Sequence, residues 1–585
     1  MKIALISCPW QLFNRPSIQL ASLKAFLNER LPKLKVDLYH FYLNIANCLG
    51  YELYRKISET VWLSEPIYGA LLYPEKKDEV KRFWERNSRK ILKEKISFEK
   101  ICGLIKEESE RLIDSIDWRK YILVGFSICF SQLTSSLYFI RQIKKRADVK
   151  IVVGGSSCSG DLGESLLDVY DEIDYVIQGE GELPLYHLVL SLIDGKKIEF
   201  PGILSRESSS KGISQIQDLD ELPIPDYSDY FEQIKHVRPF YPKLLMEMSR
   251  GCWWRRCAFC NLNLQWKGYR RKSAERIKKE LKELVERYQI LSVSFTDNLI
   301  PKAKEIFSEI KGLKKDLQLF AEIRADTPLD LLILMERAGV KEVQVGIEAL
   351  STSLLRKMRK GVTAIENIEI MKNCEAKGTP NLTGNLILQF PGSDEKDVEE
   401  TLKNMEFVFY FRPLKGIPFW LGYKSYVWRN PRLFGIKNIT LHPNYRHVFP
   451  ENILRRLKLM IQGYHGDMKK QKRIWKPVKE KIKKWESFYK KLHKDGEPIL
   501  SYQDGGDFLI IRQKKEDMNM IHKLRGVSRM IYLFCQKHRS ISEIIERFKI
   551  DEVKLLPFLR MMEEKRLMFS EKEKFLSLAV PSKGY

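Results

Sequence analysis

Three cysteines, Cys252, Cys257 and Cys260, lie close together in the stretch SRGCWWRRCAFCNLN. Thiolates are soft ligands, which suit iron-sulfur clusters or zinc better than hard cations. A structural zinc site needs a fourth ligand, and the nearest histidine is His236. A four-iron cluster held by three cysteines keeps one iron open to a substrate. The cysteine count therefore favours a cluster with an open iron, and zinc remains the alternative.

The cysteines follow an apolar run that predicts a strand, and from there to residue 437 apolar runs alternate with helical patterns. The predicted strands are Leu244 to Met248, Leu291 to Thr296, Leu317 to Ile323, Val340 to Val345, Pro380 to Leu388 and Ile417 to Tyr423. Six strand-helix units predict a partial (β/α)6 barrel over residues 243–437. We expect its functional groups on the loops at the carboxyl ends of the strands.

The cysteine loop resembles the radical S-adenosylmethionine (SAM) signature, in which three cysteines hold a [4Fe-4S] cluster and an aromatic residue, here Phe259, precedes the last one. The usual loop has three residues between the first two cysteines, and this one has four. The Arg-Gly-Cys-Trp-Trp opening and the tail Asn261 to Asn263 resemble the cobalamin-dependent radical SAM C-methyltransferases that mature ribosomally made peptides. The resemblance implies three cofactors: a [4Fe-4S] cluster, SAM, and cobalamin in its methylcobalamin form.

Charged residues follow three of the predicted barrel strands and are candidates for binding SAM. Asp297, Glu322 and Glu348 could take the SAM ammonium or ribose diol, and Arg324 could bind its carboxylate as a bidentate pair. Strand-end carboxylates also serve as helix caps, so SAM binding and helix capping both stay open as interpretations of each carboxylate. The run from Gly346 to Ser351 resembles the ribose and carboxylate region of the family.

The first 200 residues predict a parallel sheet of Rossmann type. Its predicted strands are Lys2 to Ser7, Tyr121 to Ser127, Lys150 to Gly154 and Asp174 to Gln178, each followed by a helical pattern. Ligands of such sheets bind at the carboxyl ends of the strands. The resemblance implies a cobalamin-binding domain there, with candidate contacts Pro9, Trp10, Ser127, Gly154, Gly155, Ser156, Gly179, Glu180 and Gly181.

Residues 44–118 predict a helical insertion in this sheet that is rich in aromatic residues. It could act as a lid or serve only for packing. Residues 201–242, which include a segment rich in Ser, Asp and Pro, predict a linker. Residues 438–500 predict a connector that contains a basic, solvated helix.

Residues 501–585 predict a small module with a strand pair, three helices and a closing hairpin. Ser540 and Glu543 have the spacing of a capping box. Three helices with a β-wing suggest a winged helix, and the module resembles the PqqD-like domains that capture a leader peptide along a strand edge. The implied partner is therefore a precursor peptide with a leader sequence.

Composition and charge indicate the class of protein and where in the cell it works. The chain has 585 residues, a net charge of +25 and seven further cysteines that are scattered singly, unlike a disulfide framework. No apolar run is long enough to span a bilayer, and no signal-peptide pattern is present. We expect a cytoplasmic protein with no membrane partner. Because the lysines spread along amphipathic helices, nucleic acid is the less favoured explanation of the charge.

The predicted function is transfer of a methyl group from SAM, through methylcobalamin, to a carbon of a residue in a ribosomally made precursor peptide. An electron donor such as flavodoxin or ferredoxin would reduce the cluster. Two alternatives stay open: a radical SAM and cobalamin enzyme acting on RNA or a small metabolite, and a regulator in which a cobalamin or redox sensor controls a winged helix.

Overall fold

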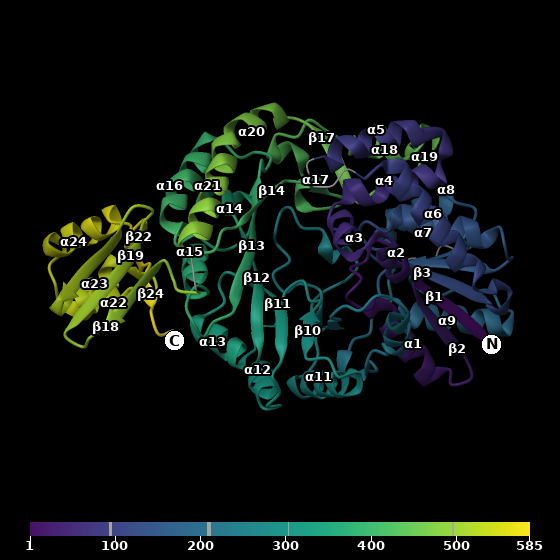
Figure 1. Ribbon diagram of the computed structural model, residues 1–585, viewed down its shortest axis with the longest axis horizontal. Coiled ribbons are helices and arrows are strands. Elements are labelled where there is room, and N and C mark those ends of the chain that lie inside the picture. Colours follow the sequence, from purple (N-terminus) through teal and green to yellow (C-terminus); the bar gives the residue numbers. More distant parts are fainter. Residues whose placement is uncertain (90, 93–95, 208–211, 302, 494–495, 585) are drawn as a thin grey trace.

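The computed structural model describes residues 1–89, 91–92, 96–207, 212–301, 303–493 and 496–584. Three units lie side by side along the long axis (Figure 1). An N-terminal α/β unit occupies one end, a half-open barrel lies in the middle, and a small C-terminal unit occupies the other end. No helix in the described part of the chain is long and apolar enough to cross a bilayer.

The N-terminal unit is built on a sheet of order β2-β1-β3-β4-β5-β6 within the described residues. Its strands are β1 (Lys2–Ser7), β2 (Lys35–His40), β3 (Leu123–Ser127), β4 (Lys150–Gly154), β5 (Tyr175–Ile177) and β6 (Ile203–Leu204). All pairs are parallel except β5 with β6. The prediction of four strands omitted β2 and β6. Each of the two lies at an edge, so neither has the continuous apolar run of a strand buried on both faces.

Helices cover both faces of this sheet because successive side chains of each strand point to opposite sides. Ile3 and Leu5 pack against one group of helices, whereas Ala4 and Ile6 pack against the other. The helices of this unit are α1 (Ile18–Arg30), α2 (Phe41–Leu49), α3 (Tyr51–Ser58), α4 (Val61–Leu72), α5 (Lys77–Ser88), α6 (Phe98–Asp114), α7 (Leu133–Lys144), α8 (Asp161–Val169) and α9 (Glu182–Asp194).

The predicted insertion is helical and packs into the core of the N-terminal unit. Tyr54, Tyr68 and Trp84 are at most 1% exposed. These aromatic side chains therefore serve packing, which is the second of the two interpretations given for the insertion.

The segment 201–242 is not an open linker. Residues of β6 join the sheet, and helix α10 (Ser228–Gln233) packs beside β2. The Gln233 amide donates to the Leu38 carbonyl oxygen at 2.6 Å, and its side-chain oxygen accepts from the His40 backbone N–H at 3.0 Å. Residues 208–211 of this segment lie outside the described residues. The described remainder also contacts the barrel, since the Tyr227 hydroxyl donates to the Leu245 carbonyl oxygen at 2.7 Å and Asp220 accepts from the Ser273 N–H at 2.9 Å. The segment is therefore an ordered connection that packs on both units.

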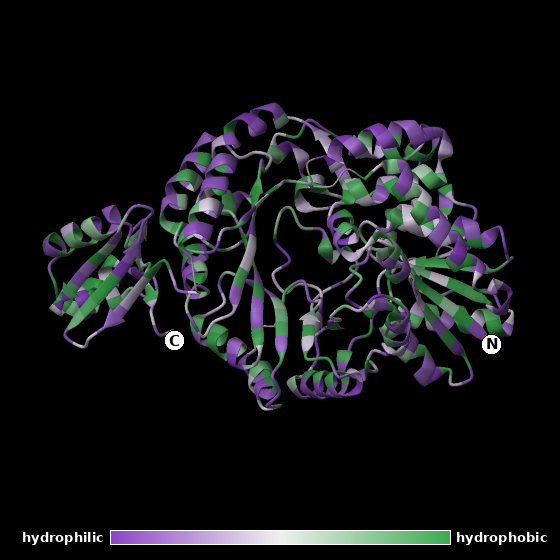
Figure 2. Cartoon of the chain, in the orientation of Figure 1, coloured by the Kyte–Doolittle hydropathy of each residue, from purple (hydrophilic) through white to green (hydrophobic). Residues whose placement is uncertain are grey.

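The central unit contains the predicted parallel strands in the order β14-β13-β12-β11-β10-β7 among the described residues. They are β7 (Leu244–Met246), β10 (Ser292–Phe295), β11 (Gln318–Arg324), β12 (Val340–Glu348), β13 (Asn381–Leu388) and β14 (Lys415–Pro418). The outer helices are α11 (Ala274–Tyr288), α12 (Lys304–Lys311), α13 (Leu329–Arg337), α14 (Thr352–Lys357), α15 (Ala364–Asn373) and α16 (Glu395–Val408). Figure 2 shows α11 mainly hydrophilic on its outer side, as expected of a helix that covers a barrel.

The predicted connector is more ordered than expected. Its strands β16 (Asn438–Leu441) and β17 (Ile461–His465) form an antiparallel sheet with β15 (Leu421–Gly422). The predicted last barrel strand, Ile417 to Tyr423, includes β15, which belongs to this sheet and not to the barrel. The short helix α17 (Tyr426–Arg429) precedes β16, and α18 (Tyr445–Val448) and α19 (Glu451–Leu454) lie between β16 and β17. Helix α20 (Met468–Ile474) precedes α21 (Lys476–Leu492). In α21, Val478, Ile482 and Trp485 are buried in the barrel core. The basic helix is therefore solvated on one side only.

The C-terminal unit combines a sheet of order β20-β19-β18-β24 with a second, antiparallel sheet of order β21-β23-β22 in the described residues. Its elements are β18 (Leu500–Asp504), β19 (Phe508–Lys514), β20 (Asn519–Arg525), α22 (Gly526–Phe534), β21 (Arg539–Ser540), α23 (Ile541–Phe548), α24 (Glu552–Glu564), β22 (Met568–Glu571), β23 (Lys574–Ser577) and β24 (Val580–Pro581). The prediction of one strand pair missed β18 and β20. The predicted capping box at Ser540 is present.

Candidate active site

The three cysteines lie on a loop that leaves the carboxyl end of β7. Strand β8 (Ser249–Arg250) pairs with β9 (Arg270–Arg271) and closes the base of the loop. At Gly251, φ is +87° and a Cβ would lie 2.3 Å from the Gly268 carbonyl oxygen, so only glycine fits there. The Ala258 N–H donates to the Met358 carbonyl oxygen at 2.8 Å. The loop is therefore fastened at its base and at its centre.

The cysteine side chains are half-buried. Burial raises the pKa of the Cys260 thiol to about 12 and also raises the pKa of Cys257. Metal binding releases the protons of such thiols, because the thiolate is the ligand. A [4Fe-4S] cluster takes each cysteine on a separate iron, whereas zinc needs four ligands around one point. Within the described residues no group of three His, Cys, Asp or Glu side chains is placed to hold a single metal ion. The three cysteines on one half-buried loop fit a cluster.

The long spacer between the first two cysteines builds a tryptophan-arginine stack. The Arg324 guanidinium lies 4.3 Å from the centre of the Trp254 ring, and the indole N–H donates to the Arg359 carbonyl oxygen at 3.1 Å. Arg324 also donates to the Lys360 carbonyl oxygen at 2.7 Å, and its side chain is 4% exposed. These contacts occupy the guanidinium. The Arg324 side chain also donates to Asp326 at 3.3 Å and packs against the spacer, and its bidentate binding of the SAM carboxylate stays a prediction.

The three candidate SAM-binding carboxylates differ in the hydrogen bonds and ion pairs that they form with other described residues. Asp297 accepts hydrogen bonds from the Met248 N–H at 2.9 Å and from the Ser249 hydroxyl. Glu348 pairs with the Lys360 ammonium at 3.0 Å. No other described residue hydrogen-bonds the Glu322 carboxylate. Burial, followed by the charges of Glu348 and Asp297, raises the pKa of Glu322 to about 7. Glu322 therefore has oxygens available for a ligand ammonium or hydroxyl.

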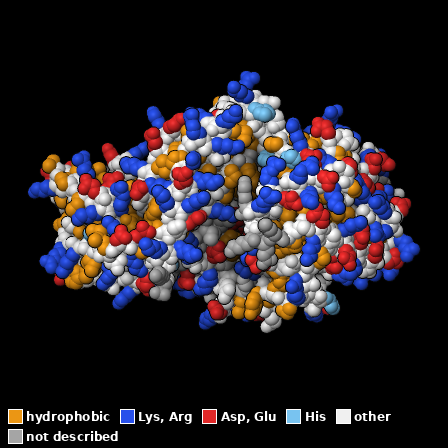
Figure 3. All heavy atoms as spheres, turned by 45° about the horizontal axis from the view of Figure 1, so that its top comes forward, with side chains coloured by type: hydrophobic (Ala, Val, Ile, Leu, Met, Phe, Trp, Pro, Cys, Tyr) orange, Lys and Arg blue, Asp and Glu red, His pale blue; other side chains and the backbone are white. Residues whose placement is uncertain are grey.

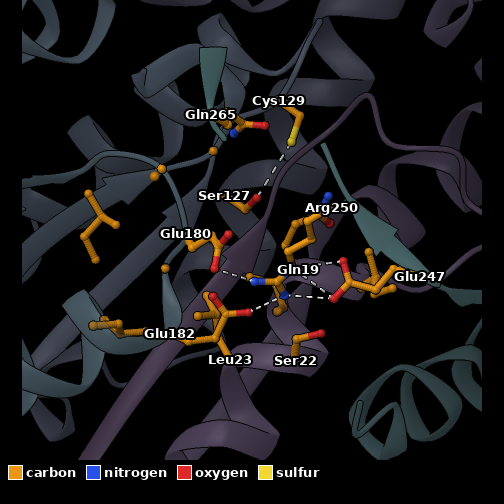
Figure 4. A pocket seen from close by; sticks show the side chains of 18 of the residues that line it. Gln19, Ser22, Leu23, Ser127, Cys129, Glu180, Glu182, Glu247, Arg250 and Gln265 are labelled. Carbon is orange, nitrogen blue, oxygen red and sulfur yellow. Dashed lines mark hydrogen bonds and ion pairs between the residues drawn. The ribbon is translucent and has the colours of Figure 1, made fainter. Parts of the chain in front are cut away.

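A cavity of about 230 Å³ lies where the N-terminal sheet meets the barrel. Residues of both units line it (Figure 4). From the N-terminal unit come the predicted residues Ser127, Gly154, Gly155, Gly179, Glu180 and Gly181, together with Gln19 and Cys129. From the barrel come Glu247, Ser249, Arg250, Gly251, Gln265, Trp266, Thr296, Asp297 and Asn298. The cavity thus joins the candidate cobalamin site to the base of the cysteine loop.

Glycines are required by the packing of the backbone at the strand ends that line this cavity. At Gly155, φ is +107° and a Cβ would lie 2.7 Å from the Ile128 carbonyl oxygen. A Cβ on Gly125 would lie 2.7 Å from the Leu5 side chain, so the cavity floor has no room for a larger residue. These strand ends fit a corrin, whose flat macrocycle needs close backbone approach and whose amides need polar partners.

Three predicted cobalamin contacts lie outside the lining of this cavity. Trp10 is 4% exposed, and its indole N–H donates to the Ser64 carbonyl oxygen at 3.0 Å, so it belongs to the core. Pro9 precedes it, and its carbonyl oxygen accepts from the Ser135 hydroxyl. Ser156 begins a short 3₁₀ turn behind Gly155. Packing of the loop after β1 into the helical insertion explains why Pro9 and Trp10 turn away.

A buried ion-pair cluster, formed by Arg250 with Glu180, Glu182 and Glu247, lies on the wall of the cavity (Figure 4). The Arg250 guanidinium lies 3.0 Å from Glu180, 2.6 Å from Glu182 and 2.8 Å from Glu247. Glu180 also accepts from the Ile216 N–H at 3.0 Å. The Glu180 carboxylate therefore turns to protein partners, although its residue lines the cavity as predicted. Sequence reasoning placed Glu182 at the end of the fourth predicted strand but missed Glu247 and Arg250 as its partners, because only the fold brings the two segments together.

Lys and Arg side chains are spread among Asp and Glu over the face in Figure 3 rather than gathered into one large patch. This distribution agrees with solvated helix faces as the source of the net charge of +25.

Comparison with known sequences identifies the central unit. Residues 246–405 match the profile of the radical SAM superfamily. The chain is 32% identical over 332 residues to an uncharacterised methyltransferase, PH0819, of Pyrococcus horikoshii, covering 52% of this chain and 71% of that protein. It is 30% identical over 247 residues to the hopanoid C-3 methylase of Methylococcus capsulatus, covering 39% of this chain and 45% of that protein.

Solved structures with the same fold are cobalamin-dependent radical SAM enzymes. One is OxsB with aqua-cobalamin and SAM bound, with a TM-score of 0.52 and 18% identity, covering 76% of this chain and 56% of that one. Another is the methyltransferase TsrM of Kitasatospora setae with tryptophan and a SAM analogue bound, with a TM-score of 0.55 and 14% identity. That match covers 83% of this chain and 88% of TsrM. The N-terminal sheet and the barrel together therefore have the fold of this enzyme class.

Proposed function

Because the chain belongs to the radical SAM superfamily, as a methyltransferase-type enzyme with the fold of the cobalamin-dependent members, we propose that it methylates a carbon of a residue in a ribosomally made precursor peptide. The methyl group would come from SAM, with cobalamin as its carrier. The observation that carries this proposal is the cavity that glycine strand ends and the base of the cysteine loop line together.

The cofactors of this enzyme class are a [4Fe-4S] cluster, SAM and cobalamin, and when bound they supply the radical chemistry and the methyl group. Cys252, Cys257 and Cys260 would hold the cluster. Glu322 would take the SAM ammonium or ribose hydroxyls, while Glu348 is held by Lys360. Gly154, Gly155 and Gly179 would let a corrin approach the backbone. The chain thereby positions the reacting groups and excludes water from them.

The open edge of β20 supports a peptide as substrate. This strand ends the sheet β20-β19-β18-β24, so one row of its backbone groups has no partner strand among the described residues. Ile521 on β20 is 70% exposed, and Val527 and Met530 on the following helix are 43% and 42% exposed. An extended leader could add a strand to this edge and place apolar side chains against these residues. We propose this edge of a winged-helix, PqqD-like module as the leader-binding site.

Methyl transfer is tested by anaerobic incubation with SAM, a reductant and the precursor peptide encoded near the gene. We expect a mass increase of one methylene on the peptide from the wild-type protein. The Cys257→Ala protein should lack a full cluster and give no product. A Cys257→Ala protein that retains a full cluster and methylates the peptide would refute the assignment of the cysteines.

Leader binding is tested with the full chain and a fluorescently labelled leader. Ile521→Asp and Val527→Asp should weaken binding at least tenfold, since each places a charge in an apolar contact worth roughly 1.5–3 kcal/mol. Leu433→Asp is the matched control, because Leu433 is 71% exposed but lies outside the C-terminal unit. Equal binding of the leader by all three variants would show that the edge of β20 is not the leader-binding site.

A small lipophilic metabolite is the second candidate substrate, since one matched relative is a hopanoid methylase. RNA as the substrate, and a regulator in which the module reads DNA, are the remaining candidates from the sequence. Methylation of an added hopanoid or tRNA, with the peptide left unmodified, would favour a different substrate. Specific operator binding without SAM turnover would favour the regulator.

A further inference from the structure

Four exposed arginines surround the outer side of the cysteine loop. Arg255 and Arg256 belong to the spacer itself, Arg359 follows α14, and Arg429 ends α17. We call these four residues the arginine rim. In the described part of the chain none of them pairs with a carboxylate. Two of them pack on aromatic rings instead: Arg256 lies 5.3 Å from the centre of Trp254, and Arg359 lies 4.1 Å from the centre of Tyr426.

The contacts of the rim tie it directly to the cluster ligands. Arg256 is bonded to Cys257 in the chain. The Arg359 carbonyl oxygen accepts the Trp254 indole N–H at 3.1 Å, and the Val427 N–H of α17 donates to the Ala258 carbonyl oxygen at 2.9 Å. The elements that carry the four arginines are therefore all fastened to the cysteine loop. A partner that covers the rim would therefore contact the loop that carries the cysteines.

We propose that the arginine rim is the docking surface of an acidic one-electron donor protein. The inference rests on the proposed function, because the cluster has to receive an electron from outside before SAM can be cleaved. One electron leaves the reduced flavin or iron-sulfur centre of the donor and enters the oxidised cluster, and no bond is made or broken. Unpaired arginines attract carboxylates without first breaking an internal ion pair, so charge complementarity favours an acidic partner.

The place of the rim favours a donor protein over a nucleic acid. A nucleic-acid surface would continue as a basic stripe that follows a phosphate backbone. The rim instead consists of four arginines on three separate segments, two of them packed on aromatic rings. Fast electron transfer needs a short path to the cluster, and the rim offers one through Arg256 and Cys257. Electrostatic steering toward such a small charged surface chiefly raises the association rate.

The test measures how fast reduced flavodoxin bleaches the oxidised cluster of the reconstituted, SAM-free enzyme in a stopped-flow instrument. Arg255→Gln/Arg256→Gln should lower the second-order rate constant roughly tenfold at low salt. The difference should vanish near 0.5 M salt, where the screening length is only about 4 Å. Reduction by dithionite, which needs no docking, should proceed equally in both proteins.

The matched control is Lys311→Gln/Arg337→Gln. It removes two exposed charges from the last turns of α12 and α13, at the amino end of the barrel strands and away from the cysteine loop. We expect this variant to react like wild type with flavodoxin. Because substrate plays no part in the measurement, failure of the methylation proposal would leave this result unaffected.

Three outcomes would overturn the docking proposal. The first is an unchanged flavodoxin rate in the rim variant. The second is an equal loss with dithionite, which would make the arginines structural. The third is loss of tRNA binding in a gel shift with the flavodoxin rate unchanged, which would assign the rim to nucleic acid.

Discussion

At the scale of single residues, Glu322 is the one of the three candidate SAM carboxylates that no other described side chain or amide engages. We expect Glu322→Gln to weaken SAM binding by roughly ten- to a hundredfold, because a charge-assisted hydrogen bond contributes about 1.5–3 kcal/mol. The dissociation constant can be followed through the change that SAM causes in the electron paramagnetic resonance spectrum of the reduced cluster. Glu342→Gln, an exposed position on the neighbouring strand β12, is the control. An unchanged constant would exclude Glu322 from the SAM site.

The same residue should make stability depend on pH in the cofactor-free protein. Burial, reinforced by the charges of Glu348 and Asp297, raises the pKa of Glu322 from 4.5 to about 7. The folded state therefore keeps a proton that the unfolded state has already lost. Its contribution is fully present below pH 4.5 and is lost as the pH rises through about 7.

In Glu322→Gln this pH-dependent loss should disappear. Urea unfolding at pH 5 and pH 8 should then show a fall in the free energy of unfolding that is smaller by an amount on the order of 3 kcal/mol. A fall equal to that of the wild type would contradict the environment described for Glu322.

At the scale of elements, the long spacer between the first two cysteines depends on a glycine opposite it. At Gly361, φ is +73° and a Cβ would lie 2.0 Å from the Trp254 ring. We expect Gly361→Ala to displace Trp254 from Arg324, to cost about 2–4 kcal/mol of stability and to lower the iron content after reconstitution.

Gly435→Ala separates the clash with Trp254 from the backbone strain of a positive φ as causes of the lost stability. Its φ is +67°, but no atom lies within 4 Å of a Cβ there, so it isolates backbone strain. We expect a loss of only about 1 kcal/mol and an unchanged iron content. Equal effects of the two variants would mean that the packing of Trp254 against Gly361 does not support the cysteine loop.

Strands with a clear apolar run could be predicted from the sequence, whereas the polar edge strands β2 and β20 could not. The strands β1, β3 and β4 have continuous apolar runs, and the barrel strands could be located because short apolar runs alternate with helical patterns. By contrast, β2 and β20 alternate polar with apolar residues because each ends a sheet. The cysteine site was predictable because its ligands are local in sequence. The partners of Arg250 and Arg324 were not, since tertiary packing alone brings them together.

At the scale of the whole molecule, the ion-pair cluster around Arg250 joins the N-terminal unit to the barrel. Glu180 and Glu182 belong to the first unit, and Glu247 and Arg250 to the second. Removing the guanidinium leaves three carboxylates buried without it. We expect Arg250→Met to cost about 3–5 kcal/mol and to lower the unfolding temperature of the N-terminal unit relative to the barrel.

The control for Arg250→Met is Arg271→Met, because Arg271 lies in the paired strand and its ion pair with Glu305 is solvent-exposed. This variant should change stability by less than about 1 kcal/mol. Differential scanning calorimetry distinguishes the two. A single unshifted transition in Arg250→Met would show that the cluster does not hold the two units together.

The measurement that tests the central claim most directly is the metal content of the anaerobically reconstituted protein. The account predicts about four iron atoms and about one cobalt atom per chain, with iron-sulfur and corrin absorption in the same sample. Cys257→Ala should lose iron but keep cobalt, because the corrin would bind at the glycine strand ends. A colourless wild-type protein without iron and without cobalt would contradict the account.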